Sequence, residues 1–171
     1  MQSIHLAAVN AMDRGTFVQT LGPTFELAPW VAQAAWAQRP FASVSALHAA
    51  MLDAVCQAPD AQQLAFLCGH PELAGREAQT GTMTAESVGE QSSAGLDALS
   101  REEMADIQQL NRAYRERHGF PFIIAVRHHN KQQIFEALRT RAAGRTEVER
   151  AAALHQIGLI TRGRIDALVR E

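Results

Sequence analysis

Residues 100–119, SREEMADIQQLNRAYRERHG, contain the start, body and end of one helix. Ser100 and Glu103 have the spacing of a capping box, in which the two side chains accept backbone N–H groups of the first turn. Gly119 is a typical residue just beyond a helix end. Apolar residues recur between them at every third or fourth position: Met104, Ile107, Leu110 and Tyr114. The stretch therefore predicts an amphipathic helix with these side chains on its inner face.

The same pattern recurs on both sides of this helix, where a capping residue or Pro precedes periodic apolar residues and Gly or Pro follows them. Residues 120–126, FPFIIAV, alone resemble a strand, and Pro121 and the lack of partner strands disfavour a sheet. We expect an all-α fold, a single compact helical domain of about seven to nine helices over residues 1–171. The further helices begin at Asp13, Pro29, Ser43, Asp60, Asn130 and Thr146, the last with a second capping box of Thr146 and Glu149.

The composition is that of an ordinary globular domain. The 171 residues include 16 Lys and Arg against 18 Asp and Glu, which gives a formal net charge of −2, and 47% are hydrophobic. A chain of this length buries roughly 70% of the surface that its unfolded form exposes, so it needs no disulfide or metal to fold. The slightly acidic balance argues against a nucleic-acid partner, because such binding depends on a basic surface.

Cysteine usage and hydropathy indicate the compartment. The two cysteines, Cys56 and Cys68, and the histidines lack the spacing of a metal site. We expect free thiols, a reducing compartment and no metal ion. The N-terminal residues lack the basic region of a signal peptide, and nowhere do about 18 apolar residues run together. These features predict a cytoplasmic protein with no membrane partner.

The helical pattern fails between Gly69 and Ser100, where the sequence is HPELAGREAQTGTMTAESVGEQSSAGLDAL. So long a stretch without apolar periodicity is either a functional segment or a mobile surface excursion. Thr84 is placed to cap a short helix. Ser87, Glu90 and Gln91 would then share one face of it, as the wall of a polar pocket or as a stripe facing solvent.

Two ionisable side chains have positions that suit a site. His70 precedes Pro71, which restricts its backbone, and an imidazole held in place suits acid–base chemistry near neutral pH. A hydrogen-bonded structural histidine is the alternative. In the last helix Arg164 borders an apolar stripe, so it must either form an ion pair or meet an anionic or ureido group of a ligand. The stripe comprises Leu154, Ile157, Thr161, Ile165 and Leu168.

Three motifs in order, HPELAGR at 70–76, ESVGEQSSAGL at 86–96 and GFPFI at 119–123, resemble the 2-oxo-4-hydroxy-4-carboxy-5-ureidoimidazoline (OHCU) decarboxylase family. The resemblance extends over nearly the whole chain, through Phe25-Glu26 and Pro29-Trp30 upstream and ITRGRI at 160–165 downstream. It implies an all-α fold, a homodimer, no cofactor, and OHCU as the small-molecule substrate. The implied activity is a carboxy-lyase that forms (S)-allantoin in urate degradation.

The resemblance also implies roles for particular residues. His70 would be the catalytic acid or base, Glu90 its carboxylate partner, and Arg164 the cation facing the substrate. Ser87 and Gln91 would supply hydrogen bonds to the substrate. Register with the closing motif favours Arg164 over Arg162 for the cationic role. The residues that would hold the substrate ring are Pro71 and the backbone of Phe122, Ile123, Ile124, Ala125 and Val126.

The chain departs from the family pattern at two places. Gly89 lies inside the expected short helix and should loosen it, and His128-His129 replaces smaller or basic residues. Other functions also remain open. They are a paralogue acting on a related ureido-imidazoline, a non-catalytic helical interaction module and, more remotely, a metal-dependent hydrolase.

Overall fold

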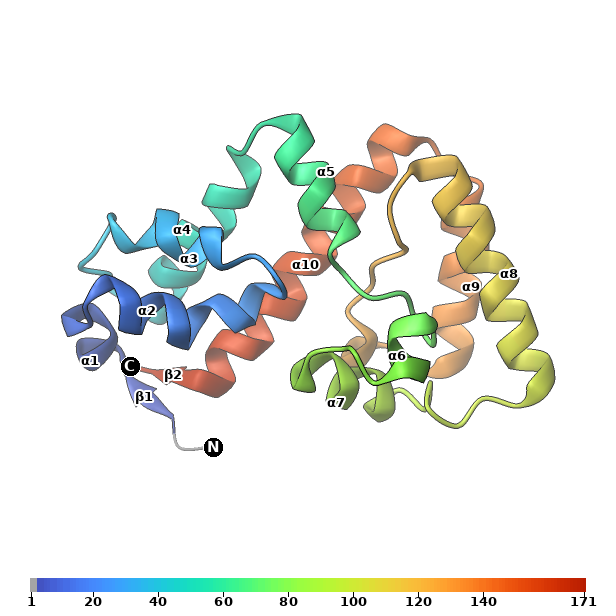
Figure 1. Ribbon diagram of the computed structural model, residues 1–171, viewed down its shortest axis with the longest axis horizontal. Helices are drawn as coiled ribbons and strands as arrows, with labels where there is room; N and C mark the ends of the chain where they lie inside the picture. Colours follow the sequence, from blue (N-terminus) through green and yellow to red (C-terminus); the bar gives the residue numbers. More distant parts are fainter. Residues whose placement is uncertain (1–2) are drawn as a thin grey trace. The chain divides into compact units, whose positions relative to one another are not determined.

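The computed structural model describes residues 3–171, and the fold is all-α as expected (Figure 1). The described chain contains ten α-helices, more than the seven to nine predicted. The additional ones are short: α1 (Leu6–Ala11) and α6 (Arg76–Thr80) have six and five residues. Segments of that length span less than two helical turns, too few for an apolar spacing to repeat, which explains why the apolar pattern did not reveal them.

By its contacts the described chain divides into two compact units, one formed by residues up to Gly69 together with Gly158–Glu171, the other by His70–Ile157. The boundary at Ile157 falls inside the longest helix, α10 (Thr146–Leu168). The prediction of a single domain over residues 1–171 stays a prediction. Each unit has its own buried side chains and is described separately below.

The first unit is built on α2 (Arg14–Leu21), α3 (Pro29–Trp36) and α4 (Val44–Cys56), where α3 packs against both α2 and α4 (Figure 1). A short 3-10 helix, η1 (Gly22–Phe25), joins α2 to the segment before α3, and α5 (Asp60–Cys68) follows α4. Asp13 and Ser43 cap α2 and α4 as predicted, through Thr16 N and Ala46 N. The buried side chains of this unit include Phe17, Leu21, Phe25, Leu47, Met51 and Ile165.

The second unit contains α6, α7 (Ala85–Ser93), α8 (Arg101–His118) and α9 (Lys131–Ala142), with α8 packed along α9. The predicted capping box of Ser100 and Glu103 is confirmed, since each side chain accepts the other's backbone N–H. Asn130 caps α9 in the same way with Gln133. The buried side chains here include Leu73, Leu96, Ile107, Tyr114, Phe120, Phe122, Ile134 and Leu138.

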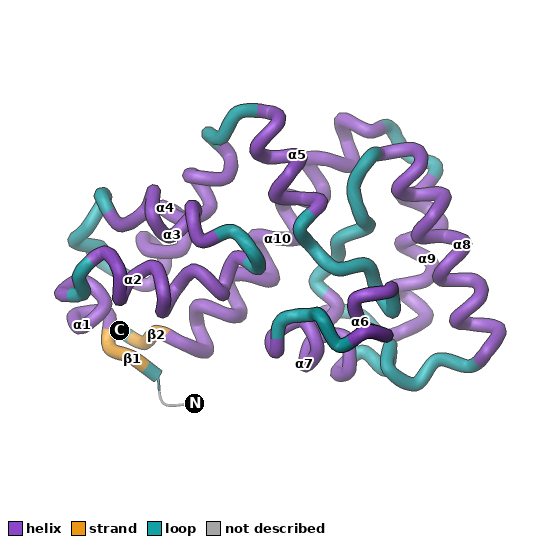
Figure 2. The backbone as a smooth tube through the Cα atoms, viewed as in Figure 1, coloured by secondary structure: helices purple, strands orange, loops and turns teal. Residues whose placement is uncertain are grey.

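Residues 120–125 form no strand and run as an extended loop into the 3-10 helix η2 (Val126–His128), as Figure 2 shows. The strands of the described chain are β1 (Ile4–His5) and β2 (Val169–Arg170), which pair in parallel over two residues. The last helix therefore stops at Leu168. Cys56 and Cys68 are both exposed, and neither forms a disulfide within residues 3–171.

Candidate functional site

The polar face of α7 is buried, which decides between the two alternatives for this segment. Thr84 caps the helix by accepting a hydrogen bond from Ser87 N at 3.3 Å. The side chains of Ser87, Glu90 and Gln91 all lie inside the second unit. Their shared burial excludes a solvent-facing stripe and leaves the polar pocket wall as the remaining alternative.

Gly89 leaves α7 intact, since the helix is continuous from Ala85 to Ser93. A Cβ at this position would meet no atom within 4 Å, so packing does not require glycine here. Val88, next to Ser87 in the same helix, is an exposed apolar residue. The helix packs against η2, which follows the extended segment 120–125 directly. Two of the predicted site segments therefore meet inside the second unit.

Gln91 ties α7 to the chain that follows His70. Its Oε1 accepts the backbone N–H of Ala74 at 2.8 Å, and its Nε2 donates to the carbonyl of Glu72 at 3.2 Å. From α8, Asn111 Nδ2 donates to the carbonyl of Leu73 at 2.9 Å. Two buried amide side chains thus fix the backbone of residues 72–74.

His70 itself is buried and begins the second unit, one residue beyond Gly69, the C-cap of α5. Pro71 and the hydrogen-bonded residues 72–74 follow it directly, so the backbone around the imidazole is constrained on its C-terminal side. A buried and locally fixed imidazole fits the predicted acid–base role. The role of His70, like those of Ser87, Glu90 and Gln91, stays a prediction.

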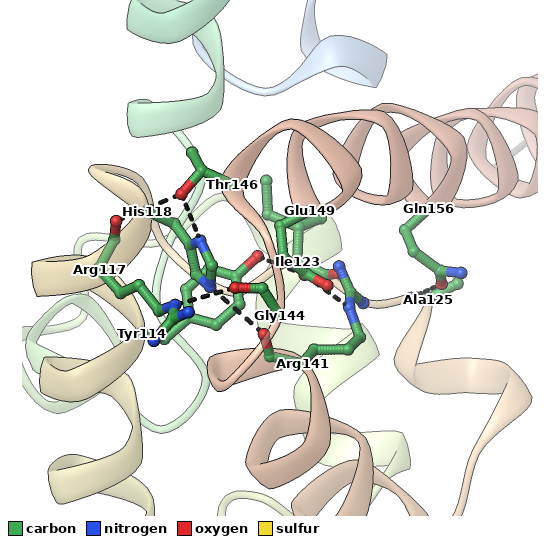
Figure 3. Close-up of polar contacts among 10 residues, drawn as sticks. All are labelled: Tyr114, Arg117, His118, Ile123, Ala125, Arg141, Gly144, Thr146, Glu149 and Gln156. Atoms are coloured by element: carbon green, nitrogen blue, oxygen red, sulfur yellow. Dashed lines mark hydrogen bonds and ion pairs between the residues drawn. The ribbon is translucent and has the colours of Figure 1, made fainter.

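The extended segment that the resemblance assigns to the substrate ring is buried from Phe120 to Val126. Side chains of two helices hold its backbone, as Figure 3 shows. Gln156 of α10 accepts the N–H of Ala125 at 2.9 Å, and Arg141 of α9 donates through Nη1 to the carbonyl of Ile123 at 3.1 Å. The Arg141 guanidinium also lies over the Phe122 ring, 4.6 Å from its centroid.

Arg141 belongs to a buried polar cluster that the sequence did not reveal (Figure 3). Its Nε contacts Glu149 Oε2 at 2.9 Å, and the same oxygen accepts the Tyr114 hydroxyl at 2.9 Å. Burial and the neighbouring Glu149 carboxylate raise the pKa of Tyr114 far above its usual value. His118 lies against the Tyr114 ring and contacts the Thr146 hydroxyl through Nδ1 at 3.0 Å.

This cluster corrects the predicted second capping box. Thr146 is the first residue of α10 rather than its cap, and its hydroxyl contacts His118 and the carbonyl of Arg117. The Glu149 carboxylate points into the core, toward Tyr114 and Arg141, because a buried arginine needs a counter-charge more than an exposed helix end does. A rule based on local sequence spacing does not take into account that the helix end and Arg141 compete for the Glu149 carboxylate.

Arg164 lies in the first unit, where it is buried at the predicted border of the apolar stripe of α10. Its Nη2 contacts Glu26 Oε1 at 2.8 Å, and Nη1 donates to the carbonyl of Thr24 at 3.5 Å. Arg162 is partly exposed and bonds to Asp166 and to the Ser45 hydroxyl. The two arginines therefore differ in burial: Arg164 is buried and Arg162 is partly exposed.

A cavity of about 450 Å³ lies between α6 and α7 in the second unit. Gln91 of the predicted site lines it, with the apolar side chains of Met83, Val88, Leu96 and Met104. Among residues 3–171, no group of three His, Cys, Asp or Glu side chains is arranged to hold a metal ion. Over the same residues, no helix is both long and apolar enough to cross a membrane.

The model of the OHCU decarboxylase family matches residues 10–166. The chain belongs to this family. A similar Mus musculus protein is named 2-oxo-4-hydroxy-4-carboxy-5-ureidoimidazoline decarboxylase. It is 39% identical to this chain, and the match covers 96% of this chain and 92% of that protein. A Haloferax volcanii protein of the same name is 40% identical, over 96% of both chains. The Bacillus subtilis "uric acid degradation bifunctional protein PucL" is 39% identical, but this chain covers 32% of it.

Two solved structures resemble the fold of this OHCU decarboxylase family member. A crystal structure of (S)-allantoin synthase superposes with a TM-score of 0.77 at 27% identity, over 98% of this chain and 54% of that one. A crystal structure of OHCU decarboxylase in the presence of (S)-allantoin has a TM-score of 0.64 at 20% identity, over 81% of this chain and 89% of that one. At 20% identity the second likeness concerns the fold alone.

Proposed function

We propose that this chain catalyses the cofactor-free decarboxylation of OHCU to (S)-allantoin in urate catabolism. Membership of the OHCU decarboxylase family supports the reaction class. The structural observation that carries the proposal is the inward-facing polar side of α7, with Ser87, Glu90 and Gln91 buried in the unit that also buries His70. A helical module without catalytic function gains no stability from such a set.

The chemistry needs no external electron sink. OHCU carries a hydroxyl and a carboxylate on one ring carbon, next to a ring C=N bond. When the bond to the carboxylate breaks, its electron pair forms a C=C bond with the neighbouring carbon, and the imine π electrons move to nitrogen, which takes a proton. The hydroxyl carbon then becomes a carbonyl as its proton leaves and the neighbouring carbon gains a proton. The net change is loss of CO2 and uptake of one proton.

The enzyme must therefore move protons and fix orientation. His70, with Glu90 as its carboxylate partner, takes the hydroxyl proton or stabilises the charge that develops on that oxygen. Pro71 and the buried backbone of residues 122–126 hold the ring, so that one face of the neighbouring carbon receives the proton. The anchoring of segment 122–126 by Arg141 and Gln156 supports this role, because a substrate-holding backbone must itself be rigid.

Ser87 and Gln91 supply hydrogen bonds at the α7 wall, and Arg164 supplies the positive charge for the ureido or ring oxygens. The amide of Gln91 also holds residues 72–74, so its contribution includes fixing the chain next to His70. We further propose a homodimer in the cytoplasm, a reducing compartment that suits two exposed cysteines outside a disulfide. Light scattering of the purified protein tests the dimer.

The function is tested by generating OHCU in situ from urate with uricase and the following hydrolase. The circular dichroism of the allantoin is followed with and without this protein, with heat-inactivated protein as the control. We expect rapid appearance of an optically active (S)-allantoin signal. A slow racemic course equal to the control contradicts the proposal and favours a paralogue that acts on a related ureido-imidazoline.

A further inference from the structure

We propose that Glu26 is a positioning residue, which holds the Arg164 guanidinium in the orientation that catalysis requires. The inference rests on the function proposed above and assigns a role to a residue outside the predicted site. Glu26 and Arg164 both belong to the first unit, and three features of that unit carry the inference. They are the burial of the pair, the backbone conformation of Glu26, and the cavity beside it.

The first feature is the ion pair. Glu26 Oε1 and Arg164 Nη2 are 2.8 Å apart, with side chains that are 4% and 6% exposed. At that burial, water screens the charges little, so the carboxylate strongly restrains the direction of the guanidinium plane. The carbonyl of Thr24 accepts from Nη1 of the same group, which adds a second point of restraint.

The second feature is the backbone of Glu26, with φ 52° and ψ −131°. A side chain disfavours this region, and a residue held there costs about 1–3 kcal/mol. Glycine would occupy it without that cost. The chain nevertheless places a glutamate at the end of η1, where the conformation turns its carboxylate to Arg164. Strain that persists beside a buried ion pair is typical of functional sites.

The third feature is a cavity of about 240 Å³ in the same unit, lined by Glu26 together with Trp30, Phe66 and Gly69. Trp30 and Phe66 pack edge to face there, with ring centroids 6.1 Å apart. Leu27, next to Glu26, is 77% exposed. Glu26 thus borders an open cavity with aromatic walls, so core residues do not enclose it on every side.

The test is a double-mutant cycle in the in situ OHCU assay, with Glu26→Gln, Arg164→Lys and the double variant. Glu26→Gln keeps the size of the side chain and removes the charge. We expect it to lower kcat/KM roughly 10- to 100-fold, as a small misplacement of a substrate-contacting group does. In the Arg164→Lys background the same change should lower it by less than about 3-fold, because the group that Glu26 positions is already lost.

Asp166→Asn is the matched control, because it removes the carboxylate partner of the exposed Arg162 on the same helix. It should leave kcat/KM at the wild-type value. If Glu26→Gln does not fold, Glu26→Asp replaces it in the cycle, since it keeps the charge and shortens the reach. Thermal unfolding of every variant is followed by circular dichroism.

Equal losses from the Glu26 change in the wild-type and Arg164→Lys backgrounds would overturn the inference, because they show that Glu26 acts independently of Arg164. Wild-type kcat/KM in Glu26→Gln would overturn it as well. Both results leave the proposed function standing, since the wild type is active in them. A wild type that neither accelerates OHCU loss nor binds (S)-allantoin in calorimetry overturns the proposed function and this inference together.

Discussion

Each compact unit contains an arginine–glutamate pair with a buried glutamate, and the two pairs differ in what surrounds them. In the second unit, Glu149 Oε2 receives Arg141 Nε and the Tyr114 hydroxyl, both at 2.9 Å. All these side chains come from regular helices. In the first unit, Glu26 meets Arg164 from a strained backbone position, beside an open cavity.

We propose that the pair in the second unit stabilises the fold and that the pair in the first unit serves the reaction. Arg141 also binds the carbonyl of Ile123 and covers the Phe122 ring, so its pair joins α8, α9, α10 and the extended segment. Such a network fixes one arrangement of helices. Arg164 is less exposed than Arg141, but its pair with Glu26 forms at a strained backbone position, so strain of about 1–3 kcal/mol offsets part of the stability that the pair provides. Substitutions at the two glutamates should therefore affect different quantities.

The largest expected effect is the loss in the free energy of unfolding caused by Glu149→Ala. Removing the carboxylate leaves the partly buried Arg141 charge without its counter-charge, and loss of one partner of a buried pair typically costs about 3–5 kcal/mol. Urea unfolding followed by circular dichroism measures the loss, with Glu26→Gln alongside. A smaller loss for Glu149→Ala than for Glu26→Gln would contradict this distinction, because the Glu26–Arg164 pair would then contribute more to the stability of the fold.

Tyr114→Phe should have an intermediate effect. It removes one hydrogen bond to Glu149 and keeps the ring, which packs against Phe120 and Phe122. We expect a loss of about 1–2 kcal/mol in the free energy of unfolding. The urea midpoint measures it. No loss would indicate that the salt bridge alone, without the hydroxyl, holds this cluster together.

A smaller effect is expected when pH changes the charge of His48 in the first unit. Burial, and then the charge of Arg162, lower the pKa of His48, although Asp166 opposes the shift. The unfolded chain therefore takes up a proton on His48 more readily than the folded chain. Stability from this group is present above the ordinary pKa of 6.5 and is lost as pH falls through and below it.

The check is urea unfolding of wild type and His48→Gln at pH about 7.5 and about 5.5. Glutamine preserves a polar contact for the Thr161 hydroxyl, which His48 Nε2 meets at 2.9 Å. The wild type should lose more stability between the two pH values than the variant does. Equal losses would mean that His48 titrates alike in the folded and unfolded chain.

The sequence predicted what local pattern determines. The capping box of Ser100 and Glu103 and the helix capped by Thr84 are confirmed, because caps involve residues within one turn of each other. The burial of Arg164 followed from its place on an apolar stripe. On α8, however, Met104 and Leu110 are less buried than Asn111 and His118, so the apolar pattern misplaced part of the inner face.

The partners of buried polar groups escaped prediction because they are distant in sequence. Glu149 is 35 positions from Tyr114, and Glu26 is 138 positions from Arg164. No spacing rule relates such residues, since tertiary packing alone brings them together. Sequence spacing alone accordingly assigns Glu149 to a helix cap. A charged residue at an otherwise buried helix position is the sequence signal that points to such a pair.

The central claim, that His70 performs acid–base chemistry on OHCU, is tested by the rate of (S)-allantoin formation with His70→Ala. His118→Gln is the control, because His118 is also buried in the second unit but contacts Thr146 and the carbonyl of Arg141. A folded His70→Ala protein should be slower than wild type by about 10²- to 10⁴-fold, while folded His118→Gln stays close to wild type. A folded His70→Ala protein with nearly full activity would contradict the claim.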